Sequence, residues 1–221
     1  LSLALADMRA ASAARLAIKR AQSQRRGMRA ALLLRDNVLH RTSIERAYLR
    51  AIAQARREVI IANAYFMPGG KLRRALILAA RRGVRVQLLL QGRYEYFMQY
   101  HAARPVYGAL LAAGVEIYEY ESSFLHAKVA VVDAQGRRAW ATVGSSNLDP
   151  LSLLLAREAN VVVRDAAFAQ QLHARLVRAR DAGGRPLDPH EYAARPWRER
   201  VLDRVAFGLM RAALWVTGNR Y

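Results

Sequence analysis

His126-Ala-Lys128-Val-Ala-Val-Val-Asp133 is the most informative stretch of this 221-residue chain. Its valines favour a buried strand, and side chains two residues apart on a strand point the same way. We therefore expect His126 and Lys128 to project together, while Ala130 and Val132 continue the same face into the core. An imidazole beside an ammonium suits a phosphate. The ammonium neutralises the phosphate oxygens, and the imidazole attacks phosphorus or protonates a leaving oxygen.

Two polar groups further along the chain extend this candidate site. Gly144-Ser145-Ser146-Asn147 follows the next expected strand, where Ser145 and Asn147 are placed to donate hydrogen bonds to the same phosphate. Glu158 begins another apolar run, and its carboxylate is placed to hold the His126 ring through the second ring nitrogen. Each feature alone has an ordinary interpretation as a solvated histidine, a turn or a strand end. The hypothesis of a phosphate site therefore depends on their order and spacing taken together.

Apolar and amphipathic segments alternate along most of the chain, with Gly83 and Gly114 at the ends of two expected helices. Short strands that alternate with helices predict an α/β fold in which helices flank a mixed, largely parallel sheet. Segments 126–133 and 139–143 are separated by a short polar turn, which predicts an antiparallel hairpin. Other strands are expected at 30–35, 59–62, 84–90, 115–118 and 159–163, and further helices at 43–57, 71–82 and 165–181.

The chain divides into three expected parts. Residues 1–28 are rich in alanine and arginine and predict a basic N-terminal helix or linker. Residues 29–182 hold the candidate site and form the expected catalytic half-domain. Residues 183–221 begin with glycines and prolines typical of a linker and continue into an amphipathic helical tail. The apolar part of the tail, 201–216, is too short to span a bilayer; it suits a helix that lies in a lipid interface or packs on protein.

Charge and composition limit the partners and the chemistry. The net charge of +19 favours nucleic acid or an anionic membrane surface as a partner. The absence of cysteine excludes disulfides, thiolate nucleophiles and cysteine-type zinc sites. No histidine–carboxylate ligand cluster or glycine-rich nucleotide loop stands out, so we expect neither a metal nor an organic cofactor. Because the chain begins with leucine, we expect it to be a piece of something longer.

The order His-x-Lys-x4-Asp, Gly-Ser-x-Asn and Glu resembles the signature of the phospholipase D superfamily. Residues 63–68 (Asn-Ala-Tyr-Phe-Met-Pro) and 142–150 (Thr-Val-Gly-Ser-Ser-Asn-Leu-Asp-Pro) are similar to bacterial cardiolipin synthases, in particular to the C-terminal half of the B type. The likeness runs from about residue 29 to about residue 180. It implies a phospholipase D-like fold. It also implies that the catalytic motif falls on His126, Lys128 and a more structural Asp133, the phosphate-binding pair on Ser145 and Asn147, and the ring-orienting carboxylate on Glu158.

The resemblance further implies a two-step transfer of a phosphodiester-linked group. One histidine attacks phosphorus, and the histidine of a second motif protonates the leaving alcohol. This chain has one His-x-Lys motif, and the near match His173-Ala-Arg175 is interpreted as the surface of a helix. The second motif is therefore expected either in the same parent chain or in a second copy related by a two-fold axis.

For function, the resemblance implies a phosphatidyltransferase that makes cardiolipin from phosphatidylglycerol and a second phospholipid. It would act peripherally on the cytoplasmic side of the bacterial inner membrane. Three alternatives stay open. A homodimer of single-motif chains would be a phosphodiesterase or nuclease acting on nucleic acid, which the positive charge also suits. Water as the acceptor would make a phospholipase D hydrolase, and the chain by itself would be inert if it lacks an essential second half.

Overall fold

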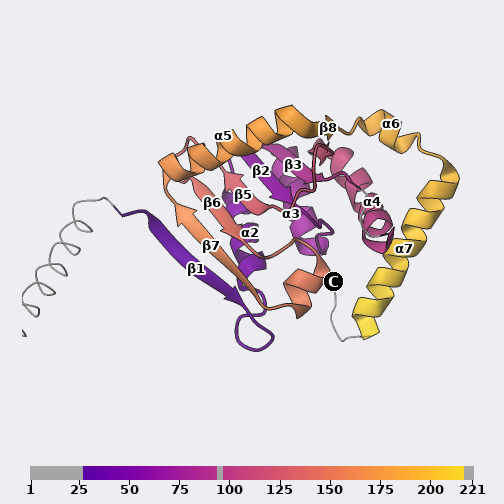
Figure 1. Ribbon diagram of the computed structural model, residues 1–221, viewed down its shortest axis with the longest axis horizontal. Helices are drawn as coiled ribbons and strands as arrows, with labels where there is room; N and C mark the ends of the chain where they lie inside the picture. The colour runs from indigo at the N-terminus through magenta and orange to yellow at the C-terminus, as the bar shows by residue number, and fades with distance from the viewer. Residues whose placement is uncertain (1–26, 94–96, 217–221) are drawn as a thin grey trace, which may run out of the picture.

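Eight strands form one mixed sheet with helices packed on both faces (Figure 1). The computed structural model describes residues 27–93 and 97–216, and the basic helix expected at 1–26 lies outside this part. In chain order the elements are β1 (Arg29–Arg35), α2 (Ser43–Gln54), β2 (Glu58–Asn63), α3 (Gly70–Arg81), β3 (Arg85–Gln91), α4 (Phe97–Leu111), β4 (Glu116–Tyr120), β5 (Lys128–Val132), β6 (Trp140–Gly144), a π-helical turn (Leu151–Leu155), β7 (Glu158–Arg164), α5 (Ala166–Gly183), β8 (Gly184–Pro186), α6 (Pro189–Ala193) and α7 (Trp197–Val216).

The strands lie in the order β1-β7-β6-β5-β2-β3-β4-β8. The mixed α/β sheet and the hairpin of β5 and β6 are confirmed. The sheet is mixed but not largely parallel as expected, because among the described strands only β2–β3 and β3–β4 pair in parallel. A parallel pair needs a long crossover connection, whereas β5 and β6 are joined only by the turn 133–139, so these strands fold back on each other.

The central strands are apolar on both faces because both faces are covered. On β2, Val59 and Ile61 pack in the cluster formed with α2, α3 and α4, whereas Ile60 and Ala62 pack in the cluster formed with α5. The segment that contains the His-x-Lys motif follows the same rule. Its Ala130 and Val132 are buried in the first cluster, as the sequence predicts, and hold β5 against the helices on that side.

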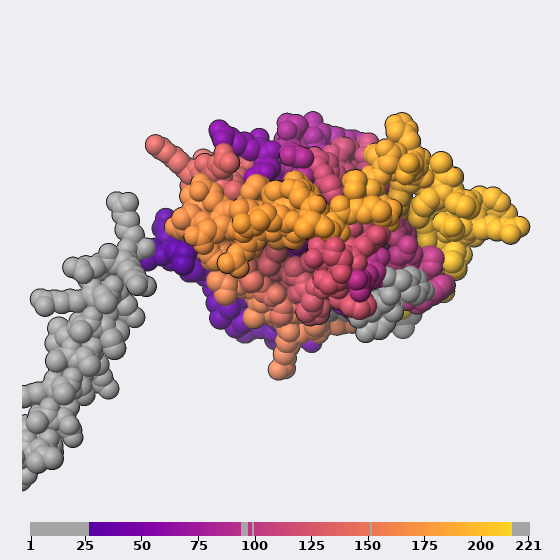
Figure 2. All heavy atoms as spheres, turned by 45° about the horizontal axis from the view of Figure 1, so that its top comes forward, coloured from indigo at the N-terminus to yellow at the C-terminus, as the bar shows by residue number. Residues whose placement is uncertain are grey.

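Helix α5 lies along one face of the sheet, and Figure 2 shows it as a ridge across that face. It begins where Asp165 accepts a hydrogen bond from the backbone N–H of Phe168 at 2.8 Å, which caps the first turn. His173 lies on this helix, 2.9 Å from the carboxylate of Glu58. The near-motif His173-Ala-Arg175 therefore lies on a helix, as expected, with the side chain of His173 half-buried.

The stretch expected to be a linker carries an additional strand. Gly184–Pro186 forms β8, which pairs antiparallel with the end of β4, so that Tyr118 lies opposite Pro186. Glycine and proline signal a chain reversal, but they do not exclude a short edge strand, where proline needs no hydrogen-bonding partner for its nitrogen. This strand carries the chain to α6 and α7, which pack beside α4 at the right of Figure 1.

The other end of the sheet is open on the α5 side. Val143 of β6 pairs with Val161 of β7, which pairs with Leu32 of β1. These three neighbours are 40%, 41% and 63% exposed. Ala141, two residues before Val143, is buried in the α5 cluster, so the exposed side chains lie beyond the reach of α5. We call Leu32, Val143 and Val161 the open sheet face; exposed apolar patches of this kind commonly mark interfaces.

Candidate active site

Lys128 is the first residue of β5 and lies opposite Asn63 of β2. It is 7% exposed, and its Nζ donates a hydrogen bond to the carbonyl oxygen of His126 at 3.3 Å. Burial lowers the pKa of the Lys128 ammonium, while the nearby carboxylates of Glu158 and Asp149 act in the opposite direction. In the described residues no carboxylate comes within ion-pair distance of Nζ. The ammonium can therefore bind phosphate oxygens.

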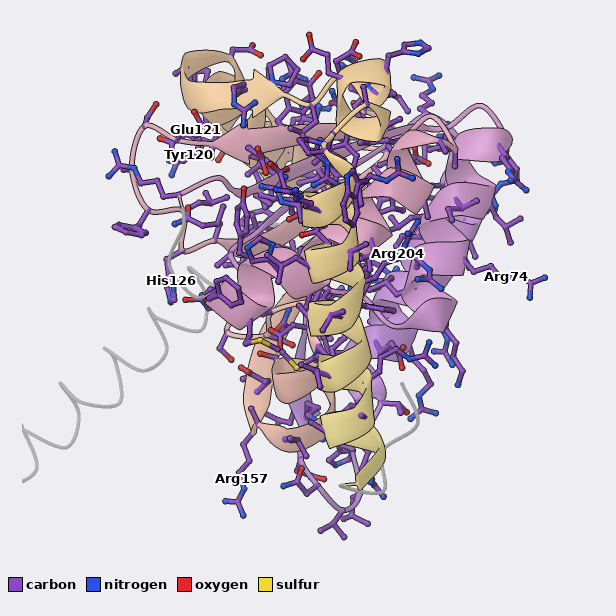
Figure 3. The ribbon with its side chains drawn as sticks, turned by 90° about the vertical axis from the view of Figure 1, so that its right-hand side faces the viewer. Arg74, Tyr120, Glu121, His126, Arg157 and Arg204 are labelled. Carbon is purple, nitrogen blue, oxygen red and sulfur yellow. The ribbon has the colours of Figure 1, made fainter. Side chains whose placement is uncertain are left out.

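His126 lies just before β5 with its side chain exposed at the surface, as Figure 3 shows. The backbone on both sides of it is anchored to the central strands. Leu125 donates its N–H to the side-chain oxygen of Gln91 at 2.8 Å, and Ala64 donates its N–H to the carbonyl oxygen of Ala127 at 3.0 Å. The imidazole therefore projects from a fixed position beside the carboxyl ends of β2 and β3.

Ser145 and Glu158 contact each other at the neighbouring edge of the sheet. The Ser145 hydroxyl donates a hydrogen bond to the Glu158 carboxylate and accepts one from the backbone N–H of Ala159 at 3.1 Å. The sequence predicts that Glu158 orients the His126 ring, but no hydrogen bond joins these two side chains in the described structure. The partner of Glu158 here is Ser145. The ring-orienting role of Glu158 stays a prediction.

The loop 144–147 is held by buried asparagines. Asn147 accepts a hydrogen bond from the N–H of Tyr65 at 3.4 Å, and Asn63 accepts one from the N–H of Leu148 at 3.1 Å. Asn160 accepts one from the N–H of Ser146 at 3.3 Å. The sequence prediction included Asn147 but missed the other two. For Asn63, the signal in the sequence was a polar residue at the end of a buried strand. For Asn160, it was the position two residues after Glu158.

Asp133 lies at the far end of β5 from Lys128. Its carboxylate accepts hydrogen bonds from the backbone N–H groups of Arg56, Arg57 and Glu58 at 2.9, 2.8 and 3.0 Å. Three charge-assisted hydrogen bonds fix the start of β2 against the end of β5. These contacts fit the structural role that the resemblance implies for Asp133.

A pocket adjoins the candidate site (His126, Lys128, Ser145, Asn147 and Glu158) at the carboxyl ends of the parallel strands, where ligands of open α/β sheets commonly bind. The residues that line it come from strands, helices and loops and include Ala64, Tyr65, Gln91, Arg104, Glu119, Asp149 and, from α7, Met210. Two of its lining residues, Arg104 and Glu119, form a buried ion pair that sequence reasoning missed. Glu119 pairs with Arg104 at 2.8 Å and with Arg185 at 2.6 Å. Burial raises the pKa of the Glu119 carboxyl, and the two arginines oppose that shift.

No metal centre is formed by the part of the chain that the structure describes, since no group of three or more histidine or acidic side chains comes together there.

The chain shares its fold with solved structures that include a member of the phospholipase D class. Nuc from Salmonella typhimurium, described as a phospholipase D family member, matches 73% of this chain and 99% of its own, with a TM-score of 0.60 and 20% identity. Phosphatidylserine synthase from Haemophilus influenzae Rd KW20 matches 86% of this chain and 46% of its own, with a TM-score of 0.61 and 12% identity. At these identities the likeness concerns the fold alone.

Sequence comparison gives the family. The family model described as "Cardiolipin synthase, PLD-like domain" matches residues 48–179, and the chain belongs to this family. It is 46% identical over 180 residues to cardiolipin synthase B of Escherichia coli K12, which covers 81% of this chain and 43% of that protein. It is 52% identical over 142 residues to cardiolipin synthase B of Salmonella typhi, covering 64% of this chain and 33% of that protein. The chain thus spans less than half the length of these relatives.

Proposed function

We propose that this chain supplies one half-site of a phosphatidyltransferase that makes cardiolipin from phosphatidylglycerol. The observation that carries the proposal is the buried Lys128 ammonium between His126 and the Ser145–Glu158 pair. This arrangement occurs in a chain 46% identical over 180 residues to a cardiolipin synthase B. A cation, a hydroxyl and an exposed imidazole suit the charge that develops on a phosphodiester under attack.

The proposed transfer has two balanced steps. One histidine nitrogen attacks phosphorus of phosphatidylglycerol, so that a P–N bond forms, the P–O bond to glycerol breaks, and glycerol leaves with a proton from the second histidine. A hydroxyl of a second phospholipid headgroup, such as that of another phosphatidylglycerol, then attacks phosphorus. A P–O bond forms, the P–N bond breaks, and the hydroxyl proton passes to the second histidine. His126 supplies one of these two roles, and Lys128 neutralises the phosphate oxygens in both steps.

The second histidine comes from another motif-bearing half, either in the same parent chain or in a second copy. The open sheet face supports this proposal, because Leu32, Val143 and Val161 expose apolar surface on β1, β6 and β7, and Ser145 and Glu158 lie at the ends of two of these strands. Packing against another half would bury this surface. The proposal also places the protein peripherally on the cytoplasmic side of the bacterial inner membrane. The net charge of +19 supports an anionic lipid partner.

The test is turnover of labelled phosphatidylglycerol in vesicles by the chain and by the chain mixed with a half that carries the second motif. Cardiolipin and free glycerol are measured by mass spectrometry. We expect His126→Ala to abolish both products and His40→Ala to leave them unchanged, because His40 is an exposed histidine outside the half-site. Normal cardiolipin formation by His126→Ala would refute the proposal.

The same preparation separates the remaining alternatives. Phosphatidic acid without cardiolipin would identify water as the acceptor and a phospholipase D hydrolase. Cleavage of DNA that requires His126, without any lipid product, would identify the nucleic-acid phosphodiesterase. Activity of the chain alone that rises with the square of its concentration would show that two copies complete the site.

A further inference from the structure

The outer side of α7 carries an apolar stripe. Its members are spaced four residues apart and are 68%, 44%, 52% and 58% exposed, in chain order. At about 100° per residue these positions turn by roughly 40° at each step, and the middle of the stripe lies opposite Asp203, which is 2% exposed and packs against the protein. Figure 3 looks onto α7 from outside, with no other element in front of it. The stripe consists of Trp197, Val201, Val205 and Leu209.

A row of arginines lies beside the N-terminal half of this stripe, roughly 20–60° around the helix from Trp197. Arg200, Arg204 and Arg211 are exposed and fall within about 40° of one another around the helix axis. The acidic residues of α7 do not interrupt the surface. Asp203 is buried, and Glu199 lies roughly 160° around the helix from Val201. The outer side of α7 therefore combines exposed apolar groups with positive charge.

These two properties match a bilayer surface of anionic phospholipid. Apolar side chains gain free energy when they leave water for the acyl region, and guanidinium groups pair with headgroup phosphates. We infer that α7 docks the chain onto an anionic phospholipid surface, with the stripe among the acyl chains and the arginine row at the phosphates. This inference rests on the proposed function only for the choice of a lipid partner.

The docked helix would also place the half-site near its substrate. Met210 projects from α7 into the pocket that adjoins the half-site, where it meets residues at the ends of β2, β3 and β4. An α-helix is about 10 Å across. With α7 lying in the headgroup layer, the pocket is within about one helix diameter of the lipids that it would receive.

The test is flotation of the 221-residue chain with vesicles, without measuring turnover. Vesicles of phosphatidylglycerol mixed with phosphatidylcholine are compared with phosphatidylcholine alone. Leu209→Glu on α7 is matched by Leu78→Glu on α3, where the leucine is 43% exposed. Arg204→Glu is matched by Arg74→Glu, which changes charge equally on a helix that Figure 3 shows on another side of the molecule. Circular dichroism verifies that each variant is folded.

We expect the wild type to float with phosphatidylglycerol vesicles, and Leu209→Glu and Arg204→Glu to bind at least roughly tenfold more weakly than their α3 controls. Equal binding by all four variants would overturn the inference, because attraction would then depend on overall charge. A different result would show that α7 contacts protein instead: the wild type forms an oligomer without lipid and does not bind vesicles, and only the α7 substitutions dissociate this oligomer. Because His126→Ala leaves α7 unchanged, it should still float, which separates a failure of docking from a failure of the proposed catalysis.

Discussion

Lys128 shows most directly how burial and charge oppose each other in the candidate site. Its ammonium is partly removed from water, which lowers its pKa, while Glu158 and Asp149 only partly compensate. A desolvated cation without a direct carboxylate partner binds an incoming phosphate more strongly than a hydrated one. The same arrangement costs stability before the phosphate arrives. The burial of Lys128 therefore favours phosphate binding but lowers the stability of the fold.

The first prediction concerns Lys128→Met. We expect transfer to fall by roughly a hundredfold or more, because the cation that stabilises the phosphate is lost. We also expect the variant to be more stable than the wild type at neutral pH, because no charge needs desolvation. Denaturant unfolding of both proteins measures this difference. A variant less stable than the wild type would show that the carboxylates outweigh burial.

The sign of the pH dependence follows from the lowered pKa. Between the folded-state pKa of Lys128 and the higher value of an unfolded lysine, the unfolded chain binds more protons, so the stability of the wild type rises with pH. Above the unfolded value this stability is fully present, and it is lost as pH falls through the folded value. We expect the stability advantage of Lys128→Met to shrink as pH rises through this alkaline window. Unfolding curves at successive pH values give the comparison.

Two whole elements position the functional groups: the loop between β6 and β7, and the strand β5. Gly144 is required where β6 passes β7, because an added Cβ would overlap the side chain of Asn160 and the carbonyl of Ala159. Asp133 joins β5 to the start of β2 through three backbone hydrogen bonds. Both residues act on the site by fixing the position of the backbone. Mutations at them should therefore distinguish an effect on stability from an effect on phosphate binding.

For Gly144→Ala we expect a loss of about 1–3 kcal/mol of unfolding free energy, together with weaker phosphate binding, because Asn160 and the Ser145 backbone must shift. Chemical denaturation and calorimetric titration with inorganic phosphate measure the two effects. Gly70→Ala is the control, since nothing lies within 4 Å of an added Cβ there. Equal effects of the two substitutions would contradict the argument from close approach.

For Asp133→Asn we expect a loss of about 1–3 kcal/mol, because an amide group cannot accept all three backbone hydrogen bonds. The folded variant should bind inorganic phosphate as the wild type does, since Asp133 is at the other end of β5 from Lys128. Calorimetry below the unfolding transition measures this affinity. Lost binding by a fully folded variant would assign Asp133 a direct role at the site.

The molecule as a whole combines the sheet, which carries the candidate site, with a helical extension, whose Met210 lines the adjoining pocket. A buried carboxylate joins the helical extension to α4: Asp203 of α7 lies 2.7 Å from His101 of α4 and 3.1 Å from Arg195. Asp203 is 2% exposed.

In the described residues no helix is both long and apolar enough to cross a membrane.

We expect Asp203→Ala to loosen α7 because it removes both contacts from a buried position, at a local cost of about 1–3 kcal/mol. Amide hydrogen exchange should then accelerate in residues 197–213 while β2 keeps its protection. Asp181→Ala is the matched control, because the carboxylate it removes is 59% exposed and pairs with its neighbour Arg180. Unchanged protection of α7 in Asp203→Ala would show that apolar packing alone holds the helix.

The alternation of strands and helices, the hairpin and the motif from His126 to Glu158 follow from the sequence alone, because side-chain periodicity and residue spacing encode them locally. Three features depend on tertiary structure. Asn63 meets Lys128 only because β2 pairs with β5, Glu158 contacts Ser145 only because β7 returns beside β6, and Gly184–Pro186 becomes a strand only beside β4. Each joins segments far apart in the chain. Their meeting is decided by the order in which strands pair to bury both faces of the sheet, and no local pattern states that order.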